Sequence, residues 1–365
     1  MMRDPGSAEP PPKTPPLPRA ARLLVVAAYA LLAAAVALDL ATNPSLTFSP
    51  VLATAPVLAS IGTRRARVPL LTGLTALCAV APLALADPDV AFPVHLTAGA
   101  TVLAITCVST ASVVLVATRE RQLLQTRSVA EAAQRALLRP VPERIDSLRV
   151  AVRYIAAAAE AQVGGDLYEV LATPYGTRVI LGDVRGKGLG AVETAADVLG
   201  TFREAAQVEP DLGAVALRLD ATVLRRGVGE EFVTAALVEV PTVGGPAELV
   251  NCGHLPPLLL RGGTATEIQT PVPDPPLALR HLVEGPCHRT RFSFAPGDLL
   301  VLCSDGLTEA RDTAGHFYPL GERLAAMPHS ASPGPLADRV VADLRAYTGG
   351  ELSDDVALLI LRRER

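Results

Sequence analysis

The sequence predicts two parts of different fold class: an all-α region in the first third of the chain and an α+β domain in the remainder. Apolar stretches separated by short polar loops follow one another between residues 20 and 118. From about residue 143, short β-rich runs cluster without regular alternation with helices, which argues against a doubly wound parallel sheet. The 365 residues are enough for both parts.

The composition favours a membrane-associated protein and excludes several other classes. Half of the residues are hydrophobic, which is high for a soluble enzyme. The formal net charge of −4 gives no reason to expect a nucleic-acid partner. None of the five cysteines belongs to a Cys-x-x-Cys pair or is followed six residues later by arginine. The pattern therefore indicates no thiolate zinc site or redox motif, and it excludes a cysteine nucleophile for phosphate esters.

Residues 1–19 are rich in proline and predict a disordered cytoplasmic tail, because such a segment cannot build a core. Residues 20–118 then predict a transmembrane region of about four helices, at 20–41, 46–62, 68–87 and 92–118. A helix needs about 20 residues to cross the hydrocarbon core of a bilayer. The second stretch is short and contains Pro50 and Pro56, so its status as a full crossing stays open.

The charges between these stretches predict their orientation. Basic residues flank the first stretch, separate the second from the third and follow the fourth: Arg19, Arg22, Arg64, Arg65, Arg67, Arg119 and Arg121. Basic flanks mark the cytoplasmic side, so we expect a multi-pass protein of the cell membrane, in contact with its lipid, with both ends of the region and the following domain in the cytoplasm. The alternative is a buried, all-helical soluble domain.

Residues 119–142 predict a helical linker that ends at Pro140 and Pro142. Leu123, Ala130 and Leu137 repeat at intervals of seven. This pattern fits a parallel homodimer through the linker helix and an ordinary connecting helix equally well.

The domain at 143–365 is predicted to contain strands at 178–181, 232–240, 249–252, 257–260, 289–294, 299–303 and 356–361. Helices are predicted at 188–208, 211–226, 318–327 and 335–347.

Acidic residues at the ends of these elements predict the chemistry. Asp166, Asp183, Asp305 and the pair Asp354–Asp355 each lie beside glycine or a second aspartate, at a strand end or tight turn. A single Asp-Gly is usually a turn. Several such aspartates together suit Mg²⁺ or Mn²⁺, because these ions prefer carboxylate and carbonyl oxygens. Two such ions can clamp a phosphoryl group and activate a water, and phosphate monoesters hydrolyse very slowly without help.

An ordered set of motifs then points to a family. It comprises GGDLYE at 164–169, GDVRGKGLGA at 182–191, FVTAALVEV at 232–240, NCGHLPPLLL at 251–260, PPLAL at 275–279, GDLLVLCSDGLTEARD at 297–312 and SDDVALLIL at 353–361. With this set, residues 134–363 resemble the SpoIIE-like branch of the PPM (protein phosphatase 2C-like) serine/threonine phosphatases. The resemblance implies two stacked antiparallel sheets flanked by helices, with two Mn²⁺ or Mg²⁺ ions between the sheets at one edge.

The resemblance also implies roles for individual residues. The catalytic metal ligands would be Asp166, Asp183, the carbonyl of Val184, Asp305 and Asp354. Asp183 would bridge the two ions, and Asp354 is preferred over Asp355 because the family ligand is the first of the pair.

Some positions depart from the family or stay open. Glu169 stands where the family usually has aspartate, which leaves an auxiliary role there in doubt. Residues 148–160 are Ala-rich but are expected to form mainly a strand by resemblance. Lys187, with Arg185, either attracts the phosphoprotein or lies in a solvated loop. His254 either contacts the substrate phosphate or stabilises a turn.

The predicted function is therefore a membrane-anchored, metal-dependent protein phosphatase. By resemblance, its substrate would be a phosphorylated anti-sigma-factor antagonist in the cytoplasm. A first alternative is a diguanylate cyclase, because GGDLY is similar to the GGDEF signature. That motif would lie too early in its domain here and would leave the later Asp motifs unused. A second alternative is a non-catalytic membrane receptor with a phosphatase fold.

Overall fold

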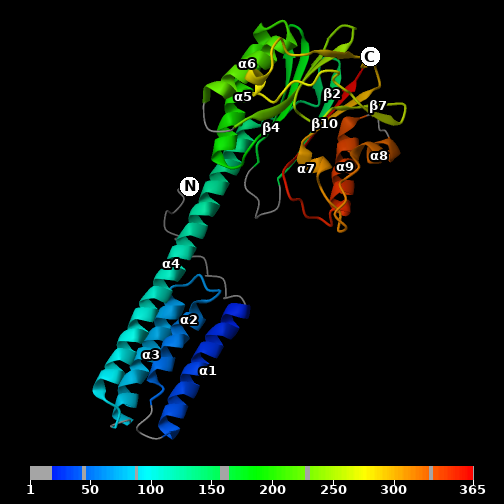
Figure 1. Ribbon diagram of the computed structural model, residues 1–365. Helices are drawn as coiled ribbons and strands as arrows, with labels where there is room; N and C mark the ends of the chain where they lie inside the picture. The colour runs from blue at the N-terminus through cyan, green and yellow to red at the C-terminus, as the bar shows by residue number, and fades with distance from the viewer. Residues whose placement is uncertain are drawn as a thin grey trace, which may run out of the picture. The chain divides into compact units, whose positions relative to one another are not determined.

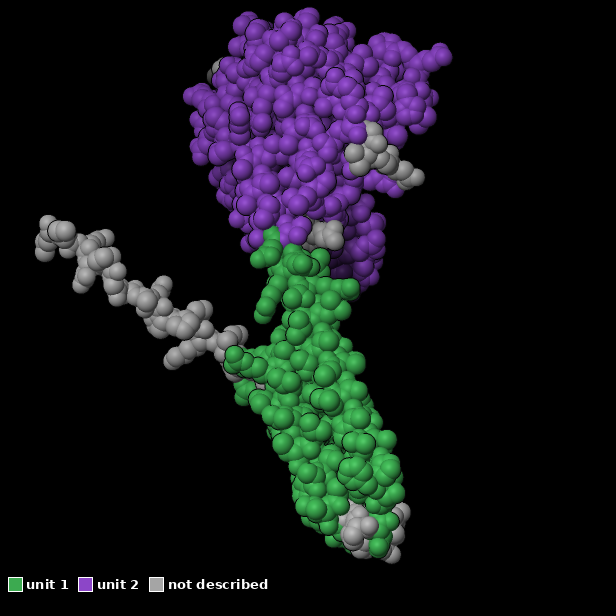
Figure 2. All heavy atoms as spheres, turned by 90° about the vertical axis from the view of Figure 1, so that its left-hand side faces the viewer, with its two compact units in different colours: residues 1–125 green, residues 126–365 purple. Residues whose placement is uncertain are grey.

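The computed structural model describes residues 19–42, 47–86, 89–156, 164–226, 231–328 and 332–364. It divides into two compact units, Met1–Gln125 and Thr126–Arg365, coloured separately in Figure 2. The boundary falls inside helix α4 (Phe92–Leu137), so the predicted linker contributes residues to both units. Of the predicted tail, only Arg19 belongs to the described part of the chain.

Three helices of the first unit are long and apolar enough to cross a membrane: α1 (Arg19–Ala41), α3 (Arg67–Ala86) and α4. The second predicted stretch folds instead as η1 (Ser49–Ala53) followed by α2 (Thr54–Ser60). These 12 residues are too few for a core of about 30 Å. Of the about four predicted helices, three among the described residues are long enough to cross alone, and the second stretch as a full crossing stays a prediction. Pro50 and Pro56 each lie in the first turn of their short helix, where proline is tolerated best, which fits two short helices in place of one long one.

The basic ends of these helices lie together. A Cβ atom placed on Gly62, after α2, would lie 3.9 Å from that of Ala21 in α1. Arg64, before α3, forms a 2.5 Å ion pair with Glu120 of α4. The start of α1, the loop between α2 and α3, and residue 120 of α4 thus share one end of the unit, as the charge pattern predicts.

The second unit contains two antiparallel sheets, as Figure 1 shows. One has the spatial order β1 (Arg144–Ile145), β2 (Leu148–Ile155), β11 (Val356–Arg363), β10 (Leu299–Cys303), β7 (Leu258–Arg261) and β8 (Thr264–Glu267). The other has the order β3 (Asp166–Thr173), β4 (Gly176–Val184), β5 (Val233–Val240), β6 (Ala247–Cys252) and β9 (Thr290–Phe292).

Helices cover the outer faces of both sheets. Helices α5 (Leu189–Val208) and α6 (Leu212–Arg226) contact the β3–β6 sheet, whereas α8 (Leu320–Ala326) and α9 (Pro333–Tyr347) contact the other. Two short helices, η2 (Arg280–Leu282) and α7 (Asp305–Thr308), lie in connections. The predicted α+β sandwich of two stacked antiparallel sheets is confirmed.

The two faces of a strand contribute side chains to two different hydrophobic clusters. In β11, Leu359 and Leu361 join a cluster with Ile180 and Leu237 of the opposite sheet. The intervening Ile360 faces a second cluster under α8 and α9. Because side chains of a strand point alternately to its two faces, an uninterrupted apolar run buries both faces of β11.

Most predicted elements of this unit are confirmed, with some additions. Strand β2 confirms the strand expected in 148–160 as far as Ile155, whereas residues 157–163 lie outside the described ranges. The short edge strands β1 and β8 were not predicted, and β3 was noted only through its first motif.

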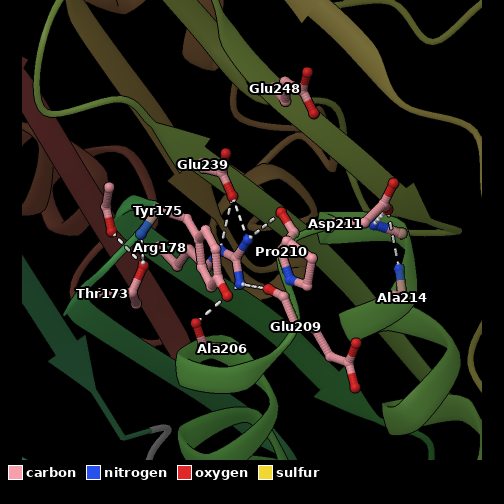
Figure 3. A network of polar contacts seen from close by, with 12 residues as sticks. Thr173, Tyr175, Arg178, Ala206, Glu209, Pro210, Asp211, Ala214, Glu239 and Glu248 are labelled. Atoms are coloured by element: carbon pink, nitrogen blue, oxygen red, sulfur yellow. Dashed lines mark hydrogen bonds and ion pairs between the residues drawn. The ribbon is translucent and has the colours of Figure 1, made fainter.

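One arginine joins strands to helix in the core. Arg178 of β4 is fully buried and forms an ion pair with Glu239 of β5 at 2.6 Å. Its Nη1 donates to the carbonyl oxygens of Ala206 at 2.9 Å and Glu209 at 2.5 Å, and its Nη2 to that of Pro210 at 3.0 Å (Figure 3). These carbonyls lie at the C-terminus of α5, where helical partners are lacking. Arg178 thereby fixes the end of α5 to the sheet.

Candidate active site

The two sheets bring the predicted acidic residues to one edge of the sandwich. Asp166, the first residue of β3, lies directly opposite Asp183 near the end of β4. From the other sheet, Asp305 follows β10, and Asp354 and Asp355 precede β11. All four predicted aspartates therefore stand at strand ends.

Glycines bring the backbones at this edge into close contact. A Cβ atom on Gly165 would lie 2.3 Å from the carbonyl oxygen of Val184. On Gly306 it would lie 2.0 Å from the carbonyl oxygen of Asp355. Such distances are far below van der Waals contact, so only glycine allows these segments to approach.

Hydrogen bonds join the two sheets at the same place. The Ser304 hydroxyl donates to Asp166 at 2.8 Å and accepts from the backbone amide of Ala357 at 2.9 Å. Asp355 accepts from the Tyr154 hydroxyl at 2.5 Å and from the amide of Gly164 at 3.0 Å. Ser304 and Tyr154 were not singled out from sequence, and their carboxylate partners, Asp166 and Asp355, are 138 and 201 residues away along the chain.

The electrostatics show a concentration of negative charge. Burial, followed by repulsion from Asp183, raises the pKa of Asp166 well above its ordinary value. Burial raises the pKa of Asp183 to about 7, with repulsion from Asp305 and Asp354 adding to the effect and Lys187 opposing it. Mutual repulsion disfavours the fully ionised cluster, so a bound cation would relieve it.

The donor set fits hard divalent cations. It consists of carboxylates and the backbone carbonyl of Val184, the oxygen ligands that Mg²⁺ and Mn²⁺ prefer. Among the described residues, however, no three His, Cys, Asp or Glu side chains are arranged as a ready metal site. Lys187 binds Asp354, with its ammonium 2.9 and 3.0 Å from the two carboxylate oxygens.

The remaining predicted residues have defined surroundings. Lys187 pairs with Asp354 while its side chain stays 39% exposed, so attraction of the phosphoprotein and a solvated loop both stay open. His254 packs in a turn, where the Asn251 side chain bonds both its amide and its carbonyl. Burial lowers the pKa of His254 to about 4, so the ring is neutral at pH 7 and cannot attract phosphate by charge. Glu169 pairs with Arg203 at 2.5 Å instead of facing the carboxylates.

A cleft of about 540 Å³ opens beside the carboxylates. Its walls include Asp305 and Asp354 together with Glu309, Arg311 and Glu351. The guanidinium of Arg311 lies 4.2 Å from the ring centroid of Phe317. A phosphorylated segment entering this cleft would reach the carboxylates directly.

Solved structures show which known fold the second unit resembles. The SiaA-PP2C domain of Pseudomonas aeruginosa matches with a TM-score of 0.56 and 20% identity, over 68% of this chain and 99% of that one. The PP2C phosphatase domain of SpoIIE from Bacillus subtilis, with a fragment of its regulatory domain, matches with a TM-score of 0.51 and 18% identity, over 60% and 65%. The RsbU and RsbW domains of Rv1364c from Mycobacterium tuberculosis match with a TM-score of 0.50 and 23% identity, over 60% and 61%. The second unit thus has the fold of PP2C phosphatase domains, and the chain spans less than two thirds of the length of the last two structures.

The family follows from the sequence profile described as Stage II sporulation protein E (SpoIIE). It matches residues 173–364, just over half of the chain. The chain therefore belongs to the SpoIIE family. The match includes Asp183, Asp305 and Asp354, whereas Asp166 precedes it. Fold and family leave the diguanylate cyclase alternative without support.

The raised pKa of Asp183 predicts how stability of the metal-free domain depends on pH. The folded state holds this proton with a pKa of about 7, against an ordinary value of 3.8 in the unfolded chain. Folding therefore takes up protons, and the free energy of unfolding of residues 126–365 in chelator should increase as the pH falls from 8 to 6. Urea unfolding at both pH values measures this. Asp183→Asn should weaken the dependence, and a wild-type domain that is less stable at pH 6 would refute it.

Proposed function

We propose that this chain is a membrane-anchored, metal-dependent phosphatase that hydrolyses phosphoserine or phosphothreonine on a cytoplasmic regulatory protein. The observation that carries the proposal is the pairing of Asp166 with Asp183 across β3 and β4, with carboxylates of the other sheet acting on both. Two Mn²⁺ or Mg²⁺ ions at this edge would stabilise the phosphoryl oxygens and acidify a water.

In this mechanism the residues of the protein would hold the metal ions and position them for the phosphate. Asp183 and the Val184 carbonyl, at the end of a central strand, would bind both ions, with Asp166, Asp305 and Asp354 completing their ligation. The Ser304 hydroxyl holds Asp166 in place. Lys187 would leave Asp354 when the ions bind, and its ammonium would then be available to the phosphate. The buried, neutral His254 fits a structural role in its turn better than contact with substrate.

The membrane assignment rests on the first unit. Its three long apolar helices and the shared end of its arginines fit a membrane region whose basic side faces the cytoplasm. Since α1 and α3 both begin at this end, η1 and α2 would lie on the return path between them, so the chain would cross four times although only three crossings consist of one long helix. Because α4 continues into the second unit, the phosphatase domain would lie on the cytoplasmic side.

The substrate we propose is a phosphorylated anti-sigma-factor antagonist, on the strength of the family. The test is release of phosphate by the full-length protein in detergent with Mn²⁺, from a phosphoserine protein and from a phosphotyrosine protein of similar charge. We expect release from the first only. Release from neither by folded, metal-loaded protein would favour the non-catalytic receptor instead.

The linker helix contacts the site through one side chain. Gln134 of α4 is buried, and its Nε2 donates to the Tyr154 hydroxyl at 2.8 Å and to the Gly164 carbonyl at 3.2 Å. The Tyr154 hydroxyl in turn donates to Asp355. We propose that the membrane region regulates the site through this chain of hydrogen bonds.

Replacing Gln134 by leucine should weaken Mn²⁺ binding several-fold, because Tyr154 and Gly164 lose the partner that holds them beside Asp355. Calorimetric titration with Mn²⁺ measures the change. Gln122→Leu, on the exposed surface of the same helix, serves as the control. Equal Mn²⁺ affinity of both variants and the wild type would exclude this coupling.

The same helix bears on the homodimer hypothesis. Of the three residues repeating at seven, Ala130 is 1% exposed and packs against Val192 of α5. Leu137 packs against the main core, and only Leu123 is well exposed, at 69%. Two of the three positions are thus used within the chain, which favours the connecting helix over a dimer seam.

A further inference from the structure

Four arginines line a single cleft at the basic end of the first unit. The cleft has a volume of about 560 Å³ and lies between the start of α3 and the region of α4 around residue 118. Its basic lining residues are Arg64, Arg65, Arg67 and Arg121. The apolar lining includes Val68, Leu71 and Val114. The positive-inside rule accounts for arginines at this end of the helices, but not for their convergence on one cleft.

The charge of the cleft is only partly compensated. Arg64 pairs with Glu120 at 2.5 Å, and both side chains remain about half exposed. Arg67 and Arg121 are exposed and form no ion pair with any residue in the described ranges. An anion in the cleft would therefore meet guanidinium groups that can donate two parallel hydrogen bonds to phosphate oxygens.

An apolar groove continues from this cleft along α3 and α4. It has a volume of about 810 Å³, and its lining includes Leu70, Cys107, Val108, Ala111 and Leu115. Val114 and Thr118 line both the groove and the arginine cleft, so the two are continuous. The helices themselves are in close contact, since a Cβ atom on Gly73 of α3 would lie 2.1 Å from the Thr106 hydroxyl of α4. Figure 1 shows α3 and α4 side by side.

We propose that this continuous site binds one anionic phospholipid, with its phosphate headgroup among the arginines and an acyl chain in the groove. The site combines positive charge and an apolar channel in the order in which a cytoplasmic-leaflet lipid presents its own parts. A free phosphate would leave the groove unused, and a zwitterionic lipid would bring its own cation to the arginines. The inference rests on the proposed membrane insertion but not on the phosphatase activity.

Native mass spectrometry of the full-length protein in detergent, with added phosphatidylglycerol or phosphatidylcholine, tests the proposal. We expect one bound phosphatidylglycerol that survives mild activation and is at least tenfold preferred over phosphatidylcholine. Arg67→Gln with Arg121→Gln should lower its occupancy at least tenfold. Arg19→Gln with Arg119→Gln removes the same charge at the same end, outside the cleft, and should leave occupancy unchanged.

A further variant and a competitor distinguish binding of a whole phospholipid from binding of phosphate alone. Ala111→Phe fills the groove and should reduce lipid binding, whereas competition by inorganic phosphate at millimolar concentration should not. Equal retention of both lipids, or equal loss in the two double variants, would overturn the proposal. If the protein requires detergent for extraction but retains no phosphatidylglycerol, the proposed lipid site is wrong while the membrane assignment stands. If it is recovered without detergent, the membrane assignment fails as well.

Discussion

Replacing Asp183 by asparagine should reduce metal-dependent hydrolysis of p-nitrophenyl phosphate by about 10³-fold or more. Asparagine keeps the shape of the side chain but removes the charge. Removal of one electrostatic stabiliser of a transition state costs about 10²–10³-fold, and Asp183 is proposed to serve both ions. The turnover number at saturating Mn²⁺ measures the effect.

The control for this variant is Asp197→Asn, which removes a carboxylate from the exposed surface of α5. Its activity should stay within about twofold of the wild type, because exposed ion pairs contribute little. Circular dichroism should show both variants folded. A folded Asp183→Asn protein with more than a tenth of wild-type activity would contradict the assignment of the bridging ligand.

Replacing Arg178 by methionine should lower the free energy of unfolding of residues 126–365 by about 3–5 kcal/mol. Methionine fills much of the volume but donates no hydrogen bond. The variant leaves the Glu239 carboxylate unpaired, and it removes the partner of three carbonyl oxygens at the end of α5. Urea unfolding followed by circular dichroism gives the difference.

Arg218→Met provides the comparison, because Arg218 pairs with Glu204 and Glu209 on the exposed surface of α6. Its loss should cost about 1 kcal/mol or less. Similar stability losses in the two variants would show that Arg178 contributes no more than a surface arginine, and that the described hydrogen bonds do not fix α5.

The acidic residues were predictable because each carries a local signal. Asp183 and Asp305 stand next to glycine at the end of a β-rich run. The apolar residues of such a run locate the end of the strand within a few residues. The structure places them at one edge, as the ordered motifs implied. The roles of these residues as ligands stay a prediction that the Asp183 variant tests.

The partners of these residues were not predictable, because they are distant in sequence. Tyr154 and Asp355 are separated by 201 residues, and Lys187 and Asp354 by 167. No local pattern encodes such a pair. Only the pairing of β2 with β11, and the meeting of the two sheets at their edge, brings these side chains together.

The second apolar stretch was left open because 46–62 is short and contains Pro50 and Pro56. The sequence did not show that this stretch forms two short helices, η1 and α2. The short edge strands β1 and β8 were not predicted, because strands of two and four residues are too short to show a recognisable alternation of apolar and polar residues.

Metal-dependent phosphatase activity is tested by hydrolysis of p-nitrophenyl phosphate by the full-length protein as Mn²⁺ is titrated into chelator-treated enzyme. We expect no release in chelator, saturable release as Mn²⁺ is added, and restoration by Mg²⁺ at higher concentration. Equal release with and without chelator, or none from folded protein shown to bind Mn²⁺, would contradict it.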